Sequence, residues 1–168
     1  PGSRVLDLGC GDGSLLSYLN SAKNVSSIGL EIDAANIEKC IASGVNVIEQ
    51  NMDDGLGNFQ SNSFDTVLLT QTLQALSNPH NLLDEMLRVG NYGIVTFPNF
   101  GNWKSRIDLT LKGRMPVSKF MPHQWYETPN IHFCTVKDFD TLCCESQIKI
   151  LTRTVVDSKH QGRWAMRA

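Results

Sequence analysis

The chain has no long apolar run, no Cys-x-x-Cys pair and no repeated or low-complexity stretch. Its longest apolar runs have the length of a β-strand, so neither a membrane-spanning helix nor a secretory signal peptide is expected. The five cysteines have no histidine at metal-binding spacing, so no metal site is expected. Their odd number predicts reduced thiols and a cytoplasmic location. Without repeats or linkers, residues 1–168 are expected to form a single domain.

Charge is distributed unevenly along the chain. The net charge is −2, but residues 1–102 hold four Lys and Arg against eleven Asp and Glu, whereas residues 103–168 hold eleven against six. This pattern predicts either an ordinary solvated face or a surface for an acidic partner or anionic substrate. Nucleic acid is not expected, because the basic cluster lacks interleaved aromatic residues and the pI is about 6.1. The cluster consists of Lys104, Arg106, Lys112, Arg114 and Lys119.

Apolar patterns typical of strands and helices alternate along the chain, which predicts an α/β fold. The continuous run FDTVLLT is typical of a strand buried on both faces of a parallel sheet. Together the patterns predict a mostly parallel, doubly wound sheet of the Rossmann type. The expected strands are Arg4–Leu8, Ser26–Ile32, Val45–Gln50, Phe64–Thr70, Tyr92–Phe97 and Ile148–Val156, and the expected helices are Ser14–Ala22, one between Asp33 and Gly44, one between Asn78 and Gly90, Trp103–Lys112, and one starting at Thr135.

Capping residues mark three of the helix starts. Asp33 is expected to cap one helix, and Asn78 followed by Pro79 is expected to start another, because proline fits the first helical position. Thr135 and Asp138 have the spacing of a capping box.

A glycine-rich loop, VLDLGCGDG, follows the first strand directly. Its alternating glycines allow positive φ angles and leave no Cβ between the backbone and a ligand. Its two carboxylates disfavour a phosphate and suit a cationic ligand with an amino-acid head. A tight strand-to-helix turn without a ligand is the alternative interpretation. The loop resembles the first motif of class I S-adenosylmethionine (SAM) methyltransferases, and its expected binding residues are Asp7, Gly9, Cys10, Gly11, Asp12 and Gly13.

The ends of three further strands supply the rest of the expected cofactor site. Glu31, followed by Ile32, ends the second strand about twenty residues after the loop, where a carboxylate can accept hydrogen bonds from ribose hydroxyls. The methyltransferase resemblance implies that Asn51 and Met52 surround the adenine, although this class usually has an acidic residue where Asn51 stands. The residues after the fourth strand, Thr70, Gln71, Thr72 and Leu73, are expected to line the methionine end. The expected cofactor is SAM or S-adenosylhomocysteine.

Longer segments resemble one particular family. These are GLEID (Gly29–Asp33), LLTQTLQAL (Leu68–Leu76), FPNFGNW (Phe97–Trp103) and the stretch Leu111–Phe139 containing WYETPNIHF. Together they resemble the MetW family of methionine-biosynthesis proteins over nearly the whole chain. The resemblance implies a methyltransferase-like fold and a partnership with homoserine O-acyltransferases of the MetX type. One departure is Asn102, where many members have histidine.

The segment WYETPNIHF has two interpretations. Tyr126, Glu127 and His132, with His123, could form an acid–base set, because histidine titrates near neutral pH. Tyr126 and His132 are therefore the candidate catalytic residues. Alternatively, the prolines and aromatic residues form a rigid loop in which polar side chains satisfy backbone groups.

Both termini of the chain lie close to predicted strands. The chain starts three residues before the first strand, without the substrate lid that methyltransferases place there. Only about a dozen residues follow Val156, of which Arg163–Ala168 could form at best a short strand. We therefore expect a fold shortened at both ends, with an open strand edge.

Two functions remain open. One is a SAM-binding regulatory subunit of the acyltransferase, and the other is a SAM-dependent methyltransferase acting on a small molecule.

Overall fold

The structure is a computed structural model that describes residues 2–118, 122–156 and 162–167. The chain divides into two compact units, unit 1 up to Phe97 and unit 2 from Pro98 onward. The single domain expected from the sequence stays a prediction. Lys119, one residue of the expected basic cluster, lies outside the described residues. Within the described ranges, no helix combines the length and the apolar character needed to cross a membrane.

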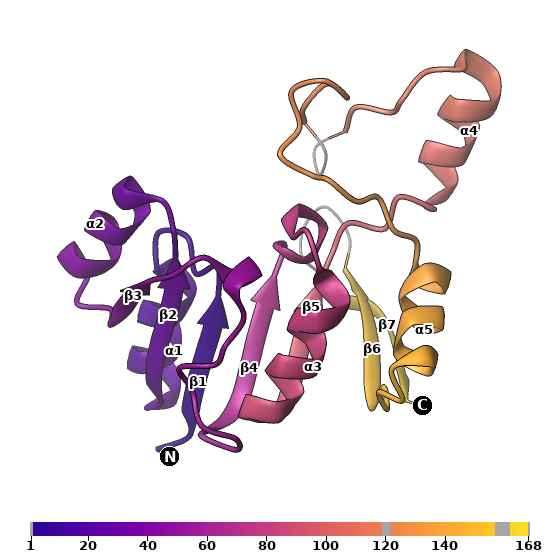
Figure 1. The fold of residues 1–168 in the computed structure, drawn as a ribbon. Helices are drawn as coiled ribbons and strands as arrows, with labels where there is room; N and C mark the ends of the chain where they lie inside the picture. Colours follow the sequence, from indigo (N-terminus) through magenta and orange to yellow (C-terminus); the bar gives the residue numbers. More distant parts are fainter. Residues whose placement is uncertain (1, 119–121, 157–161, 168) are drawn as a thin grey trace. The chain divides into compact units, whose positions relative to one another are not determined.

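Unit 1 is built on a five-stranded parallel sheet (Figure 1). Its strands are β1 (Arg4–Leu8), β2 (Ser26–Glu31), β3 (Val47–Glu49), β4 (Phe64–Thr70) and β5 (Gly90–Thr96). They lie in the order β3-β2-β1-β4-β5, and Leu6 of β1 pairs with Ile28 of β2 and with Val67 of β4. The prediction of a parallel α/β sheet is confirmed. β3 is shorter than expected at both ends, and β5 starts two residues earlier than expected.

The core of unit 1 covers both faces of the central strands. Leu6 and Leu8 of β1 have no exposed surface, and neither have Val67 and Leu69 of β4. Leu68, between these last two, is also buried. Because consecutive strand residues point to opposite faces, this unbroken burial means that both faces are covered. Each buried leucine contributes about 1.5–3 kcal/mol of transfer free energy.

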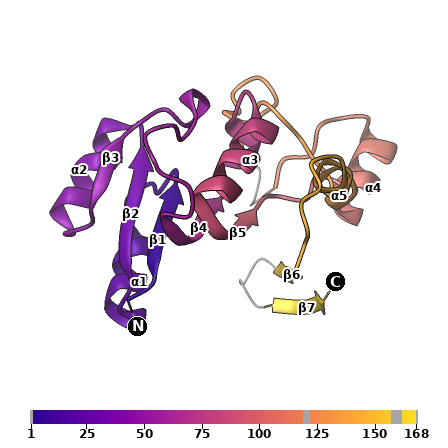
Figure 2. The same cartoon turned by 60° about the horizontal axis from the view of Figure 1, so that its bottom comes forward.

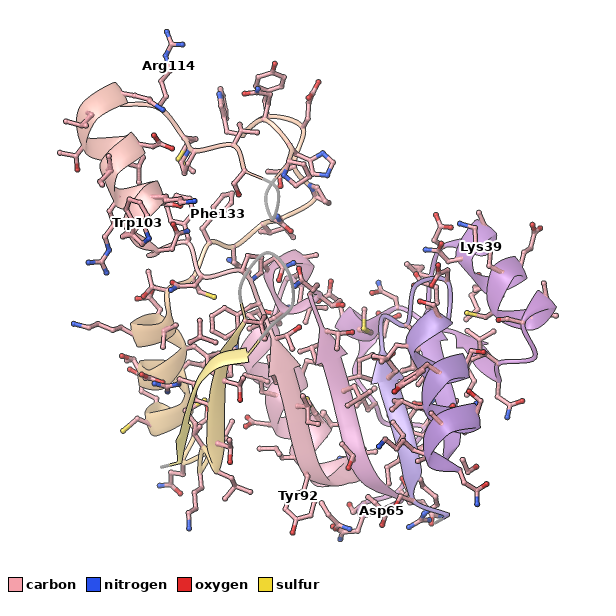
Figure 3. All side chains as sticks on the ribbon, turned by 180° about the vertical axis from the view of Figure 1, so that it is seen from behind. Lys39, Asp65, Tyr92, Trp103, Arg114 and Phe133 are labelled. Atoms are coloured by element: carbon pink, nitrogen blue, oxygen red, sulfur yellow. The ribbon has the colours of Figure 1, made fainter. Side chains whose placement is uncertain are left out.

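Three α-helices pack against the sheet. They are α1 (Ser14–Lys23), α2 (Ala34–Ala42) and α3 (Pro79–Val89). α1 packs on β2, and α3 packs on β4 and β5. These two helices lie on opposite faces of the sheet (Figures 1 and 3), and α2 lies beside β3 (Figure 2). This is the arrangement of a doubly wound fold.

The helix starts follow the sequence signals with one exception. The Asp33 side chain accepts a hydrogen bond from the amide of Asn36 at 2.9 Å, and Pro79 is the first residue of α3. Asn78 takes the N-cap position as predicted, but its side chain makes no capping hydrogen bond. Its φ of −129° and ψ of 68° depart from the extended conformation that aims a capping side chain at the helix amides.

Unit 2 contains two α-helices and a two-stranded sheet. The elements are α4 (Trp103–Lys112), α5 (Val136–Glu145), β6 (Thr152–Val156) and β7 (Gly162–Arg167). α4 has the predicted bounds, and the Asn102 side chain caps it by accepting from the Ser105 amide at 3.1 Å. The predicted capping box of α5 is also present, with Asp138 accepting from the Thr135 amide at 2.8 Å.

The last strands differ from the expectation. β6 begins at Thr152 rather than at Ile148, and it pairs with β7 in an antiparallel ladder that aligns Val155 with Trp164. β7 corresponds to the short strand that the sequence allowed within Arg163–Ala168, so the expectation that β6 ends without a partner is wrong. Residues 162–167 supply the backbone N–H and C=O groups that complete the ladder.

Thr135→Ala is expected to lower the free energy of unfolding by about 1 kcal/mol, because the side-chain oxygen that accepts from the Asp138 amide is lost. Thr135→Ser keeps this oxygen and should cost clearly less. Urea unfolding of both variants, followed by circular dichroism, measures the difference. Equal losses would contradict the capping role and would point to packing of the Thr135 methyl group against Gly101.

Candidate functional site

The candidate site lies in unit 1, at the carboxyl ends of the parallel strands. The chain runs from β1 outward to β2 and β3, then returns to the other side of β1 to form β4 and β5. The order therefore reverses between β1 and β4, which is where open α/β sheets bind their ligands. Figure 1 shows the arrowheads of β1, β2 and β4 at one edge of the sheet. The sequence predicted this switch point correctly.

The three glycines of the loop between β1 and α1 have different roles. All three have positive φ angles, of 79°, 56° and 75° for Gly9, Gly11 and Gly13. A Cβ on Gly9 would lie 2.8 Å from Oγ1 of Thr72, and one on Gly13 would lie 2.8 Å from Sγ of Cys40. These two glycines are needed for packing inside the protein. A Cβ on Gly11 would meet nothing within 4 Å, so the backbone there faces open space.

Glu31, at the end of β2, holds the loop in place. One carboxylate oxygen accepts from the Gly11 amide at 2.8 Å, and the other accepts from the amides of Ile32 and Asp33 at 2.8 and 3.0 Å. The side chain is buried. Amide donors of this kind stabilise the charged form of a carboxylate. Glu31 therefore joins the end of β2, the glycine loop and the start of α2.

Asp7 is the second carboxylate of the site and is only 1% exposed. Its Oδ1 atom has no hydrogen-bond partner among the described residues. Burial, and secondarily the negative charge of Glu31, raise the pKa of Asp7 to about 7. An unpaired buried carboxylate oxygen is costly, so its position at the switch point suggests a bound cation or donor.

Two thiols lie beneath the glycine loop. Sγ of Cys10 is 3.8 Å from Sγ of Cys40, and the Cys40 thiol donates to the carbonyl oxygen of Gly11 at 3.3 Å. Burial, together with neighbouring groups led by Cys40, raises the pKa of Cys10 to about 12. Such a thiol is a poor nucleophile, so Cys10 supports the loop by packing rather than by reaction. A Cβ on Gly29 would lie only 2.4 Å from the Cys10 sulfur, which explains the glycine inside β2.

Asp12 is exposed and lies two residues before the start of α1. Its side chain accepts from the Ser14 amide at 3.0 Å, and this hydrogen bond lowers the pKa of the Asp12 carboxyl. Asp12 therefore adds negative charge at the outer side of the loop.

The residues after β3 and β4 complete the candidate site. Oδ1 of Asn51 accepts from the Asp53 amide at 3.0 Å and so caps the 3-10 helix η1 (Met52–Asp54). The Met52 methyl group lies beside Gly9. After β4, Gln71 has a φ of 61°, which is uncommon for a non-glycine residue.

Hydrogen bonds fix the backbone of the residues that follow β4. The Gln71 amide donates to the carbonyl oxygen of Thr96 at 3.0 Å, and Oγ1 of Thr72 donates to the carbonyl oxygen of Thr70 at 3.1 Å. The sequence assigned Thr72 to the methionine end but did not predict its contact with Gly9. Its contact with Gly9 depends on the register of β1 and β4, which no local pattern reveals.

The described part of the chain contains no cluster of three His, Cys, Asp or Glu side chains arranged to hold a metal ion. Tyr126 and His132, the candidate catalytic residues, lie in unit 2 and are exposed. Among the described contacts, no hydrogen bond joins Tyr126, Glu127 and His132. Their proposed chemistry stays a prediction.

The fold has the architecture of class I methyltransferases. A SAM-dependent methyltransferase from Archaeoglobus fulgidus superposes with a TM-score of 0.70 at 19% identity, over 92% of this chain and 64% of that one. The chain also matches the family described as methionine biosynthesis protein MetW over residues 1–168, and it belongs to that family.

Two curated relatives are similar in sequence. The bifunctional methionine biosynthesis protein MetXA/MetW of Rhodopirellula baltica is 35% identical over 158 residues, which are 89% of this chain and 25% of that protein. The ubiquinone biosynthesis O-methyltransferase of Hahella chejuensis is 28% identical over 134 residues, which are 74% of this chain and 56% of that enzyme. The chain thus spans about a quarter of the first relative and just over half of the second.

Asp7→Asn is expected to raise the free energy of unfolding at pH 8 by about 1–3 kcal/mol, because the variant removes a buried charge. An aspartate in the unfolded chain releases its proton near pH 4, whereas Asp7 in the folded protein keeps it to about pH 7. The wild type therefore loses stability relative to the variant as the pH rises through this window. At pH 4 the two should differ little.

Urea unfolding between pH 4 and pH 8 measures this difference. Asp84→Asn, which removes an exposed carboxylate from α3, controls for the change in net charge. A difference between Asp7→Asn and wild type that does not vary with pH would contradict the burial cost.

Proposed function

We propose that the protein binds SAM or S-adenosylhomocysteine at the glycine loop. One observation carries the proposal: the backbone at Gly11 is open, while the Asp7 and Glu31 carboxylates adjoin the same loop. An open backbone allows a ligand to approach closely, and carboxylates favour a cation. The similarity of fold to a SAM-dependent methyltransferase supports the same ligand class.

The residues present fit this ligand. Glu31 already accepts three amide hydrogen bonds, so about one of its four lone-pair positions remains for a ribose hydroxyl. A second hydroxyl would need the Gly11 amide to be released. The unpartnered Oδ1 of Asp7 supplies negative charge for the cationic part of the ligand. When bound, SAM supplies a methyl group on a sulfonium centre.

The residues that follow β3 and β4 also have candidate roles in binding. Oδ1 of Asn51 accepts from the Asp53 amide with one of its two lone pairs, so the other lone pair and the side-chain NH₂ group are available to an adenine. Met52 provides an apolar surface beside it. Thr70 and Gln71 would line the methionine end, and the strained φ of Gln71 is typical of residues whose conformation serves a site.

Gly11→Ala is expected to weaken binding of S-adenosylhomocysteine by at least about tenfold, because the new Cβ would project into the open space assigned to the ligand. The substitution also strains the backbone by about 1 kcal/mol. Gly44→Ala is the matched control, since Gly44 has a φ of 72° and nothing within 4 Å of its Cβ position. Isothermal titration calorimetry measures both variants. Equal affinities for Gly11→Ala and Gly44→Ala would refute the site assignment.

We further propose that the protein acts with a MetX-type homoserine O-acyltransferase as its SAM-binding regulatory subunit. The support is membership of the MetW family and the R. baltica relative, which combines MetXA and MetW in one polypeptide. A SAM-responsive subunit would let SAM control the acylation step that commits homoserine to methionine synthesis. A cytoplasmic location, without nucleic-acid or membrane partners, belongs to this proposal.

Methyl transfer to a small molecule is the second candidate function. It is favoured by the 28% identity to the H. chejuensis O-methyltransferase. Transfer of a methyl group from a sulfonium centre depends mainly on proximity and in-line alignment. The side chains of unit 1 therefore do not exclude it.

The two functions predict opposite outcomes in two assays. The regulatory function predicts that the rate of homoserine acylation by the purified acyltransferase changes when this protein is added, while SAM is not consumed. The enzymatic function predicts repeated release of S-adenosylhomocysteine with a methionine-pathway metabolite as acceptor. Multiple turnovers without an effect on acylation would overturn the regulatory proposal.

A further inference from the structure

The segment that joins α4 to α5 exposes a cluster of aromatic side chains. Trp125 is 68% exposed and Tyr126 is 66% exposed, with their rings in an edge-to-face contact at 5.6 Å. Indole and phenol rings bury large areas with little loss of conformational freedom, which makes them common anchors of protein interfaces. This segment contains WYETPNIHF, which has no role in the cofactor site.

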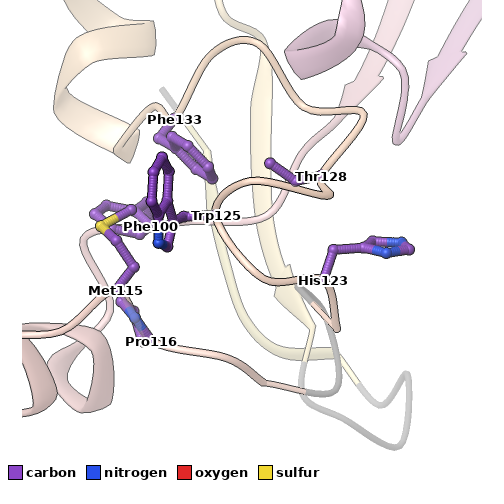
Figure 4. Close-up of a pocket in the computed structure, with 7 residues that line it drawn as sticks. All are labelled: Phe100, Met115, Pro116, His123, Trp125, Thr128 and Phe133. Carbon is purple, nitrogen blue, oxygen red and sulfur yellow. The ribbon is translucent and has the colours of Figure 1, made fainter.

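The Trp125 ring also lines a hollow within unit 2. Phe100, Met115, Trp125 and Phe133 are among the residues that line it (Figure 4). Phe100 and Phe133 contact each other with ring centroids 5.1 Å apart. We call these four residues and Tyr126 the aromatic patch. The hollow is too small for a drug-sized ligand, which normally fills a pocket of about 300–1,000 Å³.

Positive charge accompanies the aromatic patch. α4 and the residue pair after it carry Lys104, Arg106, Lys112 and Arg114. Asp108, the single acidic residue of α4, forms an ion pair with Lys112 at 2.6 Å. The Arg114 side chain extends away from the ribbon into solvent (Figure 3). α4 and the residue pair after it thus carry four cations and one anion, and an apolar patch in the same unit fits a protein surface that has an apolar centre and an acidic rim.

We propose that the aromatic patch is the docking surface for the homoserine O-acyltransferase, with the cations of α4 and Arg114 steering the approach. This inference rests on the proposed partnership. The R. baltica relative, with MetXA and MetW in one polypeptide, identifies an acyltransferase as the occupant. The cofactor site belongs to unit 1 and the patch to unit 2, so substitutions can separate the two.

The test measures binding of the 168-residue chain to the separately purified acyltransferase by biolayer interferometry. Trp125→Ala is expected to raise the dissociation rate by about 30-fold, as for a buried interface anchor. Tyr92→Ala, which removes a 59% exposed ring from β5 in unit 1, should change it less than threefold. Circular dichroism and thermal unfolding establish that each variant is folded.

A charge test remains informative if Trp125→Ala does not fold. Arg106→Glu with Arg114→Glu should lower the association rate at least about tenfold at low salt, and the difference should shrink as salt is added. Lys23→Glu with Lys39→Glu reverses two charges in unit 1 and serves as the matched control.

The outcomes separate the two proposals. No binding by the wild type would overturn the partnership and, with it, the docking surface. Binding that both test variants retain would overturn only the docking surface. Wild-type binding to phosphatidylserine vesicles that Trp125→Ala abolishes, with acyltransferase binding unchanged, would assign the patch to a membrane and would also overturn the proposal.

Discussion

The three amide hydrogen bonds of Glu31 are the interaction on which the candidate site depends. They join the Gly11 amide to the end of β2 and to the start of α2. Without them, the backbone of a loop with three positive-φ glycines would have many accessible conformations. A buried carboxylate with good amide donors restricts the loop to one of them. The open backbone at Gly11 is therefore preorganised rather than flexible.

Asp7 has the opposite character, because it lies near the same negative charge without comparable donors. Its raised pKa means that the folded protein holds a proton on this carboxyl at pH values where a free aspartate has lost it. A cationic ligand would favour the charged form of Asp7 and release that proton. Ligand affinity should thus increase as the pH rises toward and past about 7. The fold thus keeps Asp7, a destabilising buried carboxyl, at a position where a bound cation would lower the cost of its charge.

The sequence predicted the strands of unit 1, the switch point and the glycine loop, because each depends on a local pattern of apolar residues or glycine. It also predicted α4 and the capping box of α5, which depend on neighbouring residues only. It did not predict that the Gly13 position is filled by the Cys40 sulfur, or that Thr72 packs on Gly9. Those contacts join residues 27 or more positions apart, and strand register and helix packing decide them. The sequence allowed no more than a short strand within Arg163–Ala168 and did not predict that it pairs with β6, because so few residues follow Val156.

The two proposals concern different units, so regulation requires a connection between them. The polypeptide itself provides one. β5 ends at Thr96, whose carbonyl oxygen accepts a hydrogen bond from the amide of Gln71 in the candidate site. The chain then continues through Phe97 into unit 2. A ligand that changed the conformation of Gln71 would act directly on this connection. Thermodynamic linkage makes this effect reciprocal. If the ligand changes the protein's affinity for the acyltransferase by some factor, the acyltransferase changes the protein's affinity for the ligand by the same factor. A ligand with equal affinity for the free and docked protein could not regulate at all, however tightly it bound.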